Sequence, residues 1–310
     1  MQTPWGELSV SDAHVHFFSR RFFESLGAQS GKPPEKIAQA LHWDLPSGDP
    51  RELASRWTSE LDRYNLTRAA LIGSFPADEE SISIARAFQP DRFFAYAMFN
   101  PLEPEAPARA RAAFDAGVQA LCFFPAMHRF SMQDERVAPI LEVAASQPGR
   151  AVFVHCGVLT VGVRKKLGLP SFFDMRFSNP IDLHAVALCF PKLPFIVPHF
   201  GAGYFREALM LADLCPNVYL DTSSSNSWMR YEELELATVF RRALAVAGSK
   251  RLLFGTDSSF FPRGWNQTIF EQQSLVLHSL DLSAADAQMI FSGNLEGLFA
   301  NSAERALTAR

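Results

Sequence analysis

The chain has 310 residues, of which 48% are hydrophobic and 20% are charged, and its formal net charge at pH 7 is −4. This balance is typical of a packed globular protein and excludes a disordered chain. A net negative charge leaves no basic surface for nucleic acid, so nucleic acid is not an expected partner.

Features that direct a protein to a membrane or out of the cell are missing from the sequence. The first ten residues, MQTPWGELSV, have neither the basic nor the apolar region of a signal peptide. No apolar run approaches the length of a membrane span. The four cysteines form no Cys-x-x-Cys pair, and free thiols are the simplest interpretation. We therefore expect a cytoplasmic protein that does not bind a membrane.

Eight short segments rich in Val, Ile, Leu and Phe recur along the chain with little polar alternation. This composition is typical of strands that are buried on both faces of a sheet. The predicted strands cover residues 8–14, 69–73, 93–98, 118–124, 151–155, 195–199, 218–221 and 252–256.

Amphipathic segments lie between these strands, and several begin at a proline and stop at glycine or proline, as helices do. Strands that alternate with helices predict a parallel (β/α)8 TIM barrel, formed as one domain by residues 1–310. An open doubly wound sheet is the alternative, but no Gly-x-Gly-x-x-Gly motif follows the first strand. The predicted helices cover residues 49–64, 104–116, 133–146, 180–190, 203–215 and 231–247.

Two of the predicted connections are long, residues 17–49 after the first strand and 156–179 after the fifth. Both leave the carboxyl end of a strand, where barrel enzymes build their active sites. Because long connections in compact domains are commonly lids or binding loops, we expect these two to border the site.

Polar residues stand where four of the predicted strands end. The run from Asp12 to His16 ends the first strand, and His14 and His16 share a face, because side chains alternate along an extended chain. His155, His199 and Asp257 end the fifth, sixth and eighth strands. Any one of them is compatible with a core histidine or a helix cap. All of them at one end of one barrel predict a catalytic metal site.

The order of these residues resembles that of the amidohydrolase superfamily, with His-x-His after strand one, His199-Phe-Gly after strand six and Gly-Thr-Asp257 after strand eight. The segment from Ser178 to Gly203 is similar to the branch that includes aminocarboxymuconate-semialdehyde decarboxylase and lactone hydrolases of aromatic catabolism. The resemblance spans about residues 11–299.

The resemblance implies a role for each of these residues. His14, His16 and His155 would be metal ligands, and Asp257 would bind the metal or hold its water. Asp257 could also accept a proton, and His199 would serve as general acid or base.

The resemblance also implies the number of metal ions. Two-metal relatives carry a bridging carboxylated lysine at the end of strand four, but residues 117–125 of this chain contain neither Lys nor Glu. We therefore expect one divalent ion, with zinc first because imidazole suits it, and manganese or iron as alternatives.

Further residues are candidates for the substrate pocket. Arg176 and Arg263 are candidate substrate contacts, because arginine binds carboxylates bidentately. His128 follows strand four and could face the pocket. The run of residues 222–225 after strand seven lines the pocket or caps a helix.

Three functional hypotheses remain open on the sequence. The first is a metal-dependent hydrolase that uses metal-activated water on a small, carboxylate-bearing ester, lactone or amide. The second is a non-oxidative decarboxylase of an aromatic or unsaturated acid that uses the same ligands. The third is a barrel that binds a ligand without catalysis. The expected partner is a small-molecule substrate, and the resemblance implies a possible homodimer.

Overall fold

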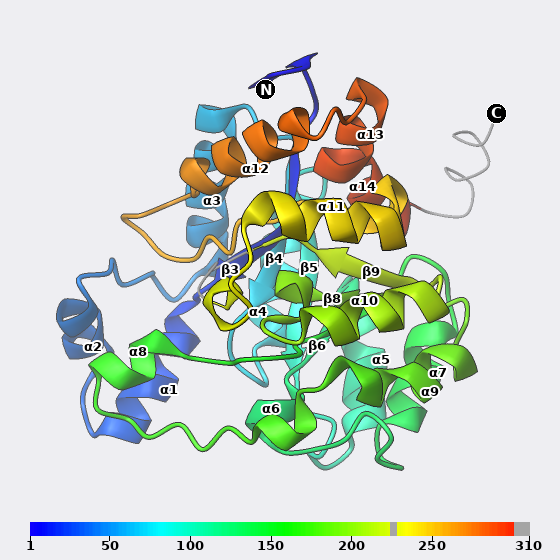
Figure 1. Cartoon of the computed structure of the whole chain (residues 1–310). Helices are drawn as coiled ribbons and strands as arrows, with labels where there is room; N and C mark the ends of the chain where they lie inside the picture. Colours follow the sequence, from blue (N-terminus) through cyan, green and yellow to red (C-terminus); the bar gives the residue numbers. More distant parts are fainter. Residues whose placement is uncertain (224–227, 301–310) are drawn as a thin grey trace.

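The computed structural model describes residues 1–223 and 228–300, and an eight-stranded sheet lies at its centre (Figure 1). Every pair of neighbouring strands is parallel, and the strands follow one another in chain order from β3 to β10. The strands are β3 (Ser11–Phe17), β4 (Arg68–Gly73), β5 (Phe93–Phe99), β6 (Ala120–Phe123), β7 (Ala151–Val154), β8 (Phe195–Val197), β9 (Val218–Asp221) and β10 (Leu252–Leu253).

Backbone hydrogen bonds join the first strand of this sheet to the segment that follows the last. The amide of Ala13 donates to the carbonyl of Phe254 over 2.8 Å, and the amide of His16 donates to Ser258 over 2.7 Å. Val15 and Ser258 form a parallel bridge between these two bonds. The sheet therefore closes on itself. The predicted (β/α)8 barrel is confirmed, and the doubly wound alternative is wrong.

Helices surround the barrel, and each of the six segments predicted as helical contains helix. Helix α3 begins where predicted, because the side chain of Asp49 accepts the Arg51 amide, and it ends at Asn65, whose backbone is left-handed. Helix α4 and helices α12 to α14 have no predicted counterpart. The helices of the outer layer are α3 (Pro50–Tyr64), α4 (Glu79–Phe88), α5 (Ala106–Asp115), α6 (Pro125–His128), α7 (Ala138–Ala145), α9 (His184–Cys189), α10 (Phe205–Leu214), α11 (Leu236–Ala247), α12 (Gln267–Ser279), α13 (Ala284–Gln288) and α14 (Asn294–Phe299).

Each strand divides its side chains between two hydrophobic clusters. Along β5, Phe94 and Tyr96 belong to the cluster inside the barrel, whereas Phe93 and Phe99 belong to the cluster between strands and helices. Both faces are therefore apolar, which explains the absence of alternation in the sequence. The ring of Phe299, from α14, lies 5.0 Å from that of Phe94 near the start of β5, so α14 closes the amino end of the barrel.

The first strand of the barrel begins and ends later than predicted. It covers Ser11–Phe17 instead of residues 8–14, so His14 lies in the strand and not at its end. The apolar Leu8 and Val10 favoured the earlier start, and the strand in the structure extends past His14 to include His16. The aspartate and the two histidines of the strand fit there, since each has a hydrogen-bond partner at the mouth of the barrel.

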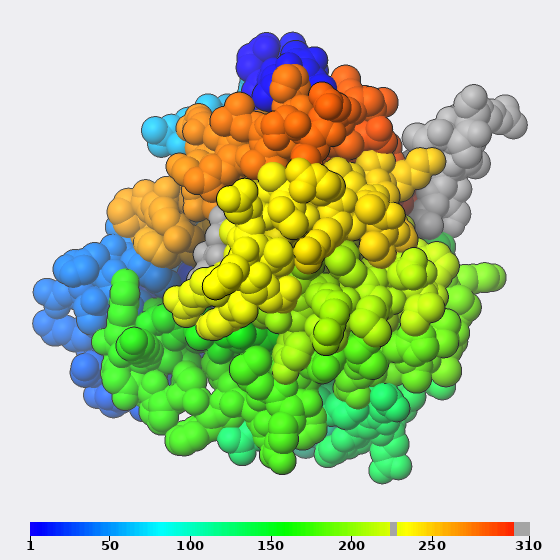
Figure 2. All heavy atoms as spheres, viewed as in Figure 1, coloured from blue at the N-terminus to red at the C-terminus, as the bar shows by residue number. Residues whose placement is uncertain are grey.

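The connections after β3 and β7, which were predicted to be long loops, contain helices. The first forms α1 (Arg20–Ser30) and α2 (Pro34–Leu41), and the second contains α8 (Gly162–Lys166). Phe22, Leu26, Ile37, Leu41 and Val163 from these helices share a third hydrophobic cluster, separate from the two of the barrel. The two connections therefore form one packed unit, which we call the mouth module, and its segments lie side by side in Figures 1 and 2.

The chain begins with a small hairpin outside the barrel, formed by β1 (Gln2–Thr3) and β2 (Gly6–Glu7). Trp5 at its turn donates to the carbonyl of Leu282 over 2.7 Å and packs on His278, so the blue hairpin meets the orange helices in Figure 2. Within residues 1–223 and 228–300, none of the helices combines the length and the apolar character that crossing a bilayer requires.

Candidate metal centre

Strand β3 presents two imidazoles at the mouth of the barrel. His14 is buried and His16 is partly exposed, and their ring centroids lie 5.2 Å apart. The pairing of β3 with β4 shifts register between Asp12 and Val15, which marks an irregularity at this position. The predicted pair of histidines is therefore close enough to bind one ion.

Asp257 completes a group of three potential ligands. It follows β10, and its amide donates to the carbonyl of His14 over 3.0 Å. One carboxylate oxygen, Oδ1, lies 3.1 Å from Nε2 of His16 and 3.6 Å from Nε2 of His14. The ligand atoms of the three residues all lie within 4.8 Å of one another.

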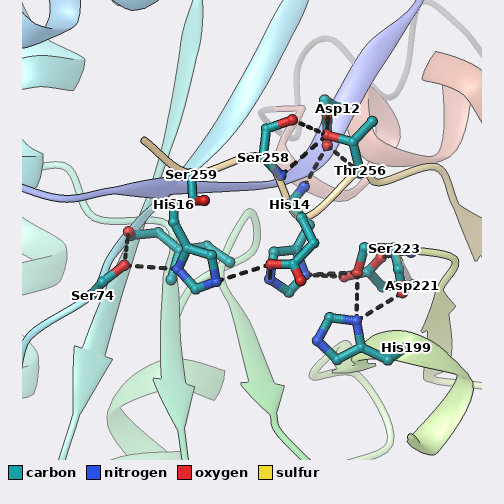
Figure 3. Close-up of polar contacts among 12 residues, drawn as sticks. Asp12, His14, His16, Ser74, His199, Asp221, Ser223, Thr256, Ser258 and Ser259 are labelled. Carbon is teal, nitrogen blue, oxygen red and sulfur yellow. Dashed lines mark hydrogen bonds and ion pairs between the residues drawn. The ribbon is translucent and has the colours of Figure 1, made fainter. Parts of the chain in front are cut away.

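Hydrogen bonds set the tautomers of the two β3 histidines (Figure 3). Nδ1 of His14 lies 2.6 Å from Oδ2 of Asp221, and an ionised carboxylate only accepts, so Nδ1 carries the proton. Nδ1 of His16 lies 2.7 Å from Oγ of Ser74, whose own hydrogen goes to the carbonyl of Ile72. Both rings therefore present an unprotonated Nε2, the form that binds a metal.

His199 is positioned by the segment that follows β9. Its Nδ1 donates to the carbonyl of Ser223 over 2.7 Å, which leaves Nε2 unprotonated. Oγ of Ser223 lies 3.1 Å from this Nδ1 and 2.9 Å from Nδ1 of His14, so one hydroxyl touches both imidazoles. Residues 224 and 225 of the predicted pocket run lie outside the described residues.

The turn that carries His199 needs a glycine opposite it. His199 has φ 55, and the loop after β7 docks on this turn through the amide of Val158, which donates to the carbonyl of Ala202. A Cβ on Gly157 would lie 2.1 Å from the carbonyl oxygen of Gly201, and Gly157 has φ +80. Only glycine fits there without displacing the backbone.

His155 lies beside His199 directly after β7. Its ring centroid is 5.3 Å from that of His199, and its other face stacks on Phe124 at 5.4 Å. Nδ1 of His155 is buried and has no hydrogen-bond partner among residues 1–223 and 228–300. A buried polar atom without a partner is costly, and a metal ion is one ligand that would satisfy it.

Burial and neighbouring charges shift the pKa values in this site. Burial opposes ionisation of Asp257, but the close contact with His16 and the other nearby imidazoles outweigh it, so the pKa of Asp257 lies below the usual range. Burial, and then repulsion from His199 and His14, lower the pKa of His155 far below its usual value. The site therefore favours an ionised carboxylate beside a neutral imidazole, as divalent metals require.

Asp12 ties β3 to the loop that carries Asp257. Its carboxylate accepts hydrogen bonds from the Thr256 hydroxyl over 2.5 Å, from the Trp265 indole over 2.7 Å and from the His14 amide over 2.9 Å. Burial raises the pKa of this carboxyl to about 6, although these hydrogen bonds oppose the rise. Asp12 therefore fixes the two ligand-bearing segments against each other.

A cavity of about 840 Å³ opens above these residues, between the barrel and the mouth module. All five residues that were predicted to bind the metal or transfer protons line this cavity. Phe18, Phe22, Phe75 and Trp228 are among its aromatic walls. The five residues are His14, His16, His155, His199 and Asp257.

Of the three predicted substrate contacts, only Arg263 lines this cavity. Its guanidinium donates to Oγ of Ser259 and to the carbonyl of Asp257. The structure does not bring Arg176 there, because the side chain of Arg176 is 84% exposed and pairs with Asp174 over 2.5 Å. His128 is absent from the lining too, since α6 directs its neighbours Met127 and Arg129 to the cavity instead.

Several residues of the site were missed in the sequence. Asp221, Ser74 and Asp12 act through hydrogen bonds on the histidines or their backbone. Ser223, which holds His199, belongs to the predicted run of residues 222–225. Only Asp221 carried a usable signal, because it ends the apolar strand β9 with a carboxylate at the same barrel edge as the ligands.

The chain belongs to the amidohydrolase family, whose model matches residues 11–299. Protein fluG of Emericella nidulans is 36% identical over 117 residues, which are 38% of this chain and 12% of that protein, so this chain matches only a small part of that relative's length. The membership confirms the resemblance seen in the sequence, and it supports a metal-dependent hydrolase in general terms.

Solved structures of similar fold confirm the barrel. An uncharacterised TIM-barrel protein from Bordetella bronchiseptica has a TM-score of 0.64 at 18% identity, covering 98% of this chain and 100% of that one. A candidate 2-pyrone-4,6-dicarboxylic acid hydrolase from Pseudomonas putida has a TM-score of 0.62 at 19% identity, covering 94% and 98%. An amidohydrolase from Burkholderia multivorans with bound zinc has a TM-score of 0.61 at 15% identity, covering 94% and 99%.

Proposed function

We propose that this protein is a metal-dependent hydrolase that acts on a small, carboxylate-bearing ester, lactone or amide. The observation that carries the proposal is the convergence of His14, His16 and Asp257, whose ligand atoms all lie within 4.8 Å of one another at the floor of a cavity. The hydrogen bonds that leave Nε2 of both histidines unprotonated also support the proposal.

The residues of the site fit one divalent ion. His14, His16 and Asp257 would hold it. His155 lies outside that group of three, and its buried Nδ1, which has no partner among the described residues, would supply a further donor. A divalent ion held there supplies Lewis acidity, which lowers the pKa of water and polarises a carbonyl. Zinc suits a site rich in imidazole, and manganese and iron are the alternatives.

His199 and Asp257 are proposed to move protons. Asp257 is ionised and partly exposed to the cavity, so its carboxylate accepts a proton from the attacking water. His199 has an unprotonated Nε2 because its Nδ1 donates to Ser223. This Nε2 takes the proton that Asp257 has accepted from the water and passes it to the leaving group, which returns Asp257 to its ionised form, while Nδ1 keeps its hydrogen bond to Ser223.

Arg263 is proposed to orient the carboxylate of the substrate. It lines the cavity beside Asp257, and it forms no ion pair with any carboxylate of the described residues. Its guanidinium is therefore able to receive an acid from solution. The similarity in fold to a candidate 2-pyrone-4,6-dicarboxylic acid hydrolase is in keeping with a lactone that carries carboxylates.

The test is a panel of small carboxylate-bearing esters, lactones and amides, offered to the zinc-loaded protein. Release of the hydrolysed acid and release of carbon dioxide are both measured. We expect hydrolysis of at least one lactone or ester, lost in the Asp257→Asn variant. Carbon dioxide without hydrolysed acid would establish the decarboxylase alternative instead. Binding without either product would establish a non-catalytic barrel.

A further inference from the structure

The cavity extends well beyond the metal centre, into the mouth module. Its outer part, here called the outer chamber, is lined by residues of α1 and of the segment around α8. A volume of about 840 Å³ falls in the upper part of the range for pockets that enclose drug-sized ligands, and a one-ring acid would leave much of it empty. The residues that define the outer chamber are Phe22, Ser25, Leu26, Gln29, Val163 and Lys166.

A continuous aromatic wall leads from the metal centre to this chamber. The ring of Phe18 stacks on the ligand His16 at 5.5 Å and 11°, and on Phe22 at 4.3 Å and 18°. Trp43 stacks on the same Phe18 at 5.3 Å and 12°. Because these rings stack on one another, they turn their edges to the cavity, and ring edges favour edge-to-face contact with an aromatic or otherwise apolar body.

The charges along the cavity favour an anionic ligand. Among the described lining residues Asp257 is the sole carboxylate, whereas Arg129, Arg164, Lys166 and Arg263 are cations. The two outer arginines are engaged, because Arg129 donates to the carbonyl of Phe172 and Arg164 to Gln29 and Pro170.

Lys166 differs from those arginines. It is exposed, and it is in none of the ion pairs among residues 1–223 and 228–300, so its ammonium is open to a ligand. Arg263 lies at the metal end and Lys166 at the outer end, so the cavity offers a cation at each end of an apolar passage.

We propose that the outer chamber binds the distal part of an elongated diacid, whose apolar body lies along the Phe18–Phe22 wall and whose second anionic group contacts Lys166. This inference rests on the proposed function for the reaction at the metal end, but it concerns binding alone. The mouth module, built from the connections after β3 and β7, thereby sets the length and the charge of the substrate.

The test measures the affinity of the zinc-loaded protein for three acids by calorimetry: benzoate, biphenylcarboxylate and biphenyldicarboxylate. We expect the two-ring acid to bind about tenfold tighter than benzoate, because the second ring buries apolar surface. The dicarboxylate should bind a further threefold or so tighter at low salt. Equal affinity for benzoate and the two-ring acid would overturn the proposal.

A matched pair of variants tests whether the second ring binds in the outer chamber. Ser25→Trp fills the outer chamber and should remove the advantage of the two-ring acids while benzoate still binds. Ala28→Trp is the control, because Ala28 is exposed on the same helix and does not line the cavity. An equal effect of the two tryptophans would count against the chamber.

A second pair of variants tests the distal anion. Lys166→Glu should weaken only the dicarboxylate, whereas Lys165→Glu, at an exposed neighbour outside the lining, should leave all three affinities unchanged. If Lys166→Glu leaves the dicarboxylate unaffected, the distal contact is wrong. These assays measure binding and need no turnover. A protein that binds the acids but hydrolyses nothing would therefore contradict the hydrolase proposal and leave this one intact.

Discussion

At the scale of single residues, the site depends on how each imidazole is held. Asp221, Ser74 and Ser223 each engage an Nδ1 atom, and the Nε2 atoms of His14, His16 and His199 are thereby left to act. In metal sites such outer partners fix both the tautomer and the orientation of the ring. The three hydrogen bonds therefore matter as much as the ligands themselves.

Replacing Asp221 by Asn tests this view. The amide keeps the shape but has no charge, so it holds the Nδ1–H of His14 less firmly, and we expect metal affinity to fall about 10- to 100-fold. Competition with a chelator measures it. Thr222→Val is the control, because Thr222 bonds Gln273 and not a histidine. Equal metal affinity in Asp221→Asn and wild type would contradict the role of Asp221.

His155, after β7, and His199, after β8, are expected to have different functions. His155→Ala should lose metal affinity, because it removes the buried donor Nδ1. His199→Ala should keep the metal and lose about 10²- to 10⁴-fold in turnover, the usual contribution of a general acid or base. Metal content and turnover are measured on both variants. A His199→Ala protein that purifies without metal, where wild type retains it, would make His199 a ligand.

Residue by residue, the sequence could predict the groups that end apolar strands but not those that act through another side chain. His155, His199 and Asp257 follow buried strands, and the barrel brings all such ends to one edge. Arg176 was a poor prediction, because a loop arginine is captured by the nearest carboxylate, Asp174. Ser74 had no signal, since a lone serine after a strand is compatible with any turn.

At the scale of elements, the barrel strands could be predicted from the sequence, whereas the helices of the mouth module were not predicted. The strands could be predicted because both of their faces are apolar. Helices α1 and α2 were missed although their buried residues recur at helical spacing, Phe22 and Leu26 in α1 and Ile37 and Leu41 in α2. What the sequence did not indicate is that these residues pack on each other and on α8, in a cluster separate from the barrel.

The packing of neighbouring elements can be tested at the contact between the loop after β7 and the turn after β8. Gly157→Ala would place a Cβ against the Gly201 and Ala202 carbonyls, at a positive φ. We expect the free energy of unfolding to fall by about 2 kcal/mol or more, measured in urea. Gly162→Ala is the matched control, because a Cβ there meets no atom within 4 Å. Similar stabilities for the two variants would show that the close contact is wrong.

At the scale of the whole molecule, the fold brings a metal centre, an aromatic cavity and cations to one mouth. α14 closes the opposite end of the barrel, and the mouth module restricts the site side, so substrate reaches the metal through one cavity. Homodimerisation and a cytoplasmic location stay predictions. The central claim is the metal, because the roles of His199, Asp257 and Arg263 all presuppose it.

The most direct test of that claim is elemental analysis of the protein purified with zinc, beside the His14→Ala and His16→Ala variants. Ser292→Ala is the control, because the buried hydroxyl of Ser292 pairs with that of Ser11, which is not a ligand. We expect one divalent ion per chain in wild type and control, and almost none in either histidine variant. Wild type without a stoichiometric ion, or histidine variants that hold as much metal as wild type, would contradict the account.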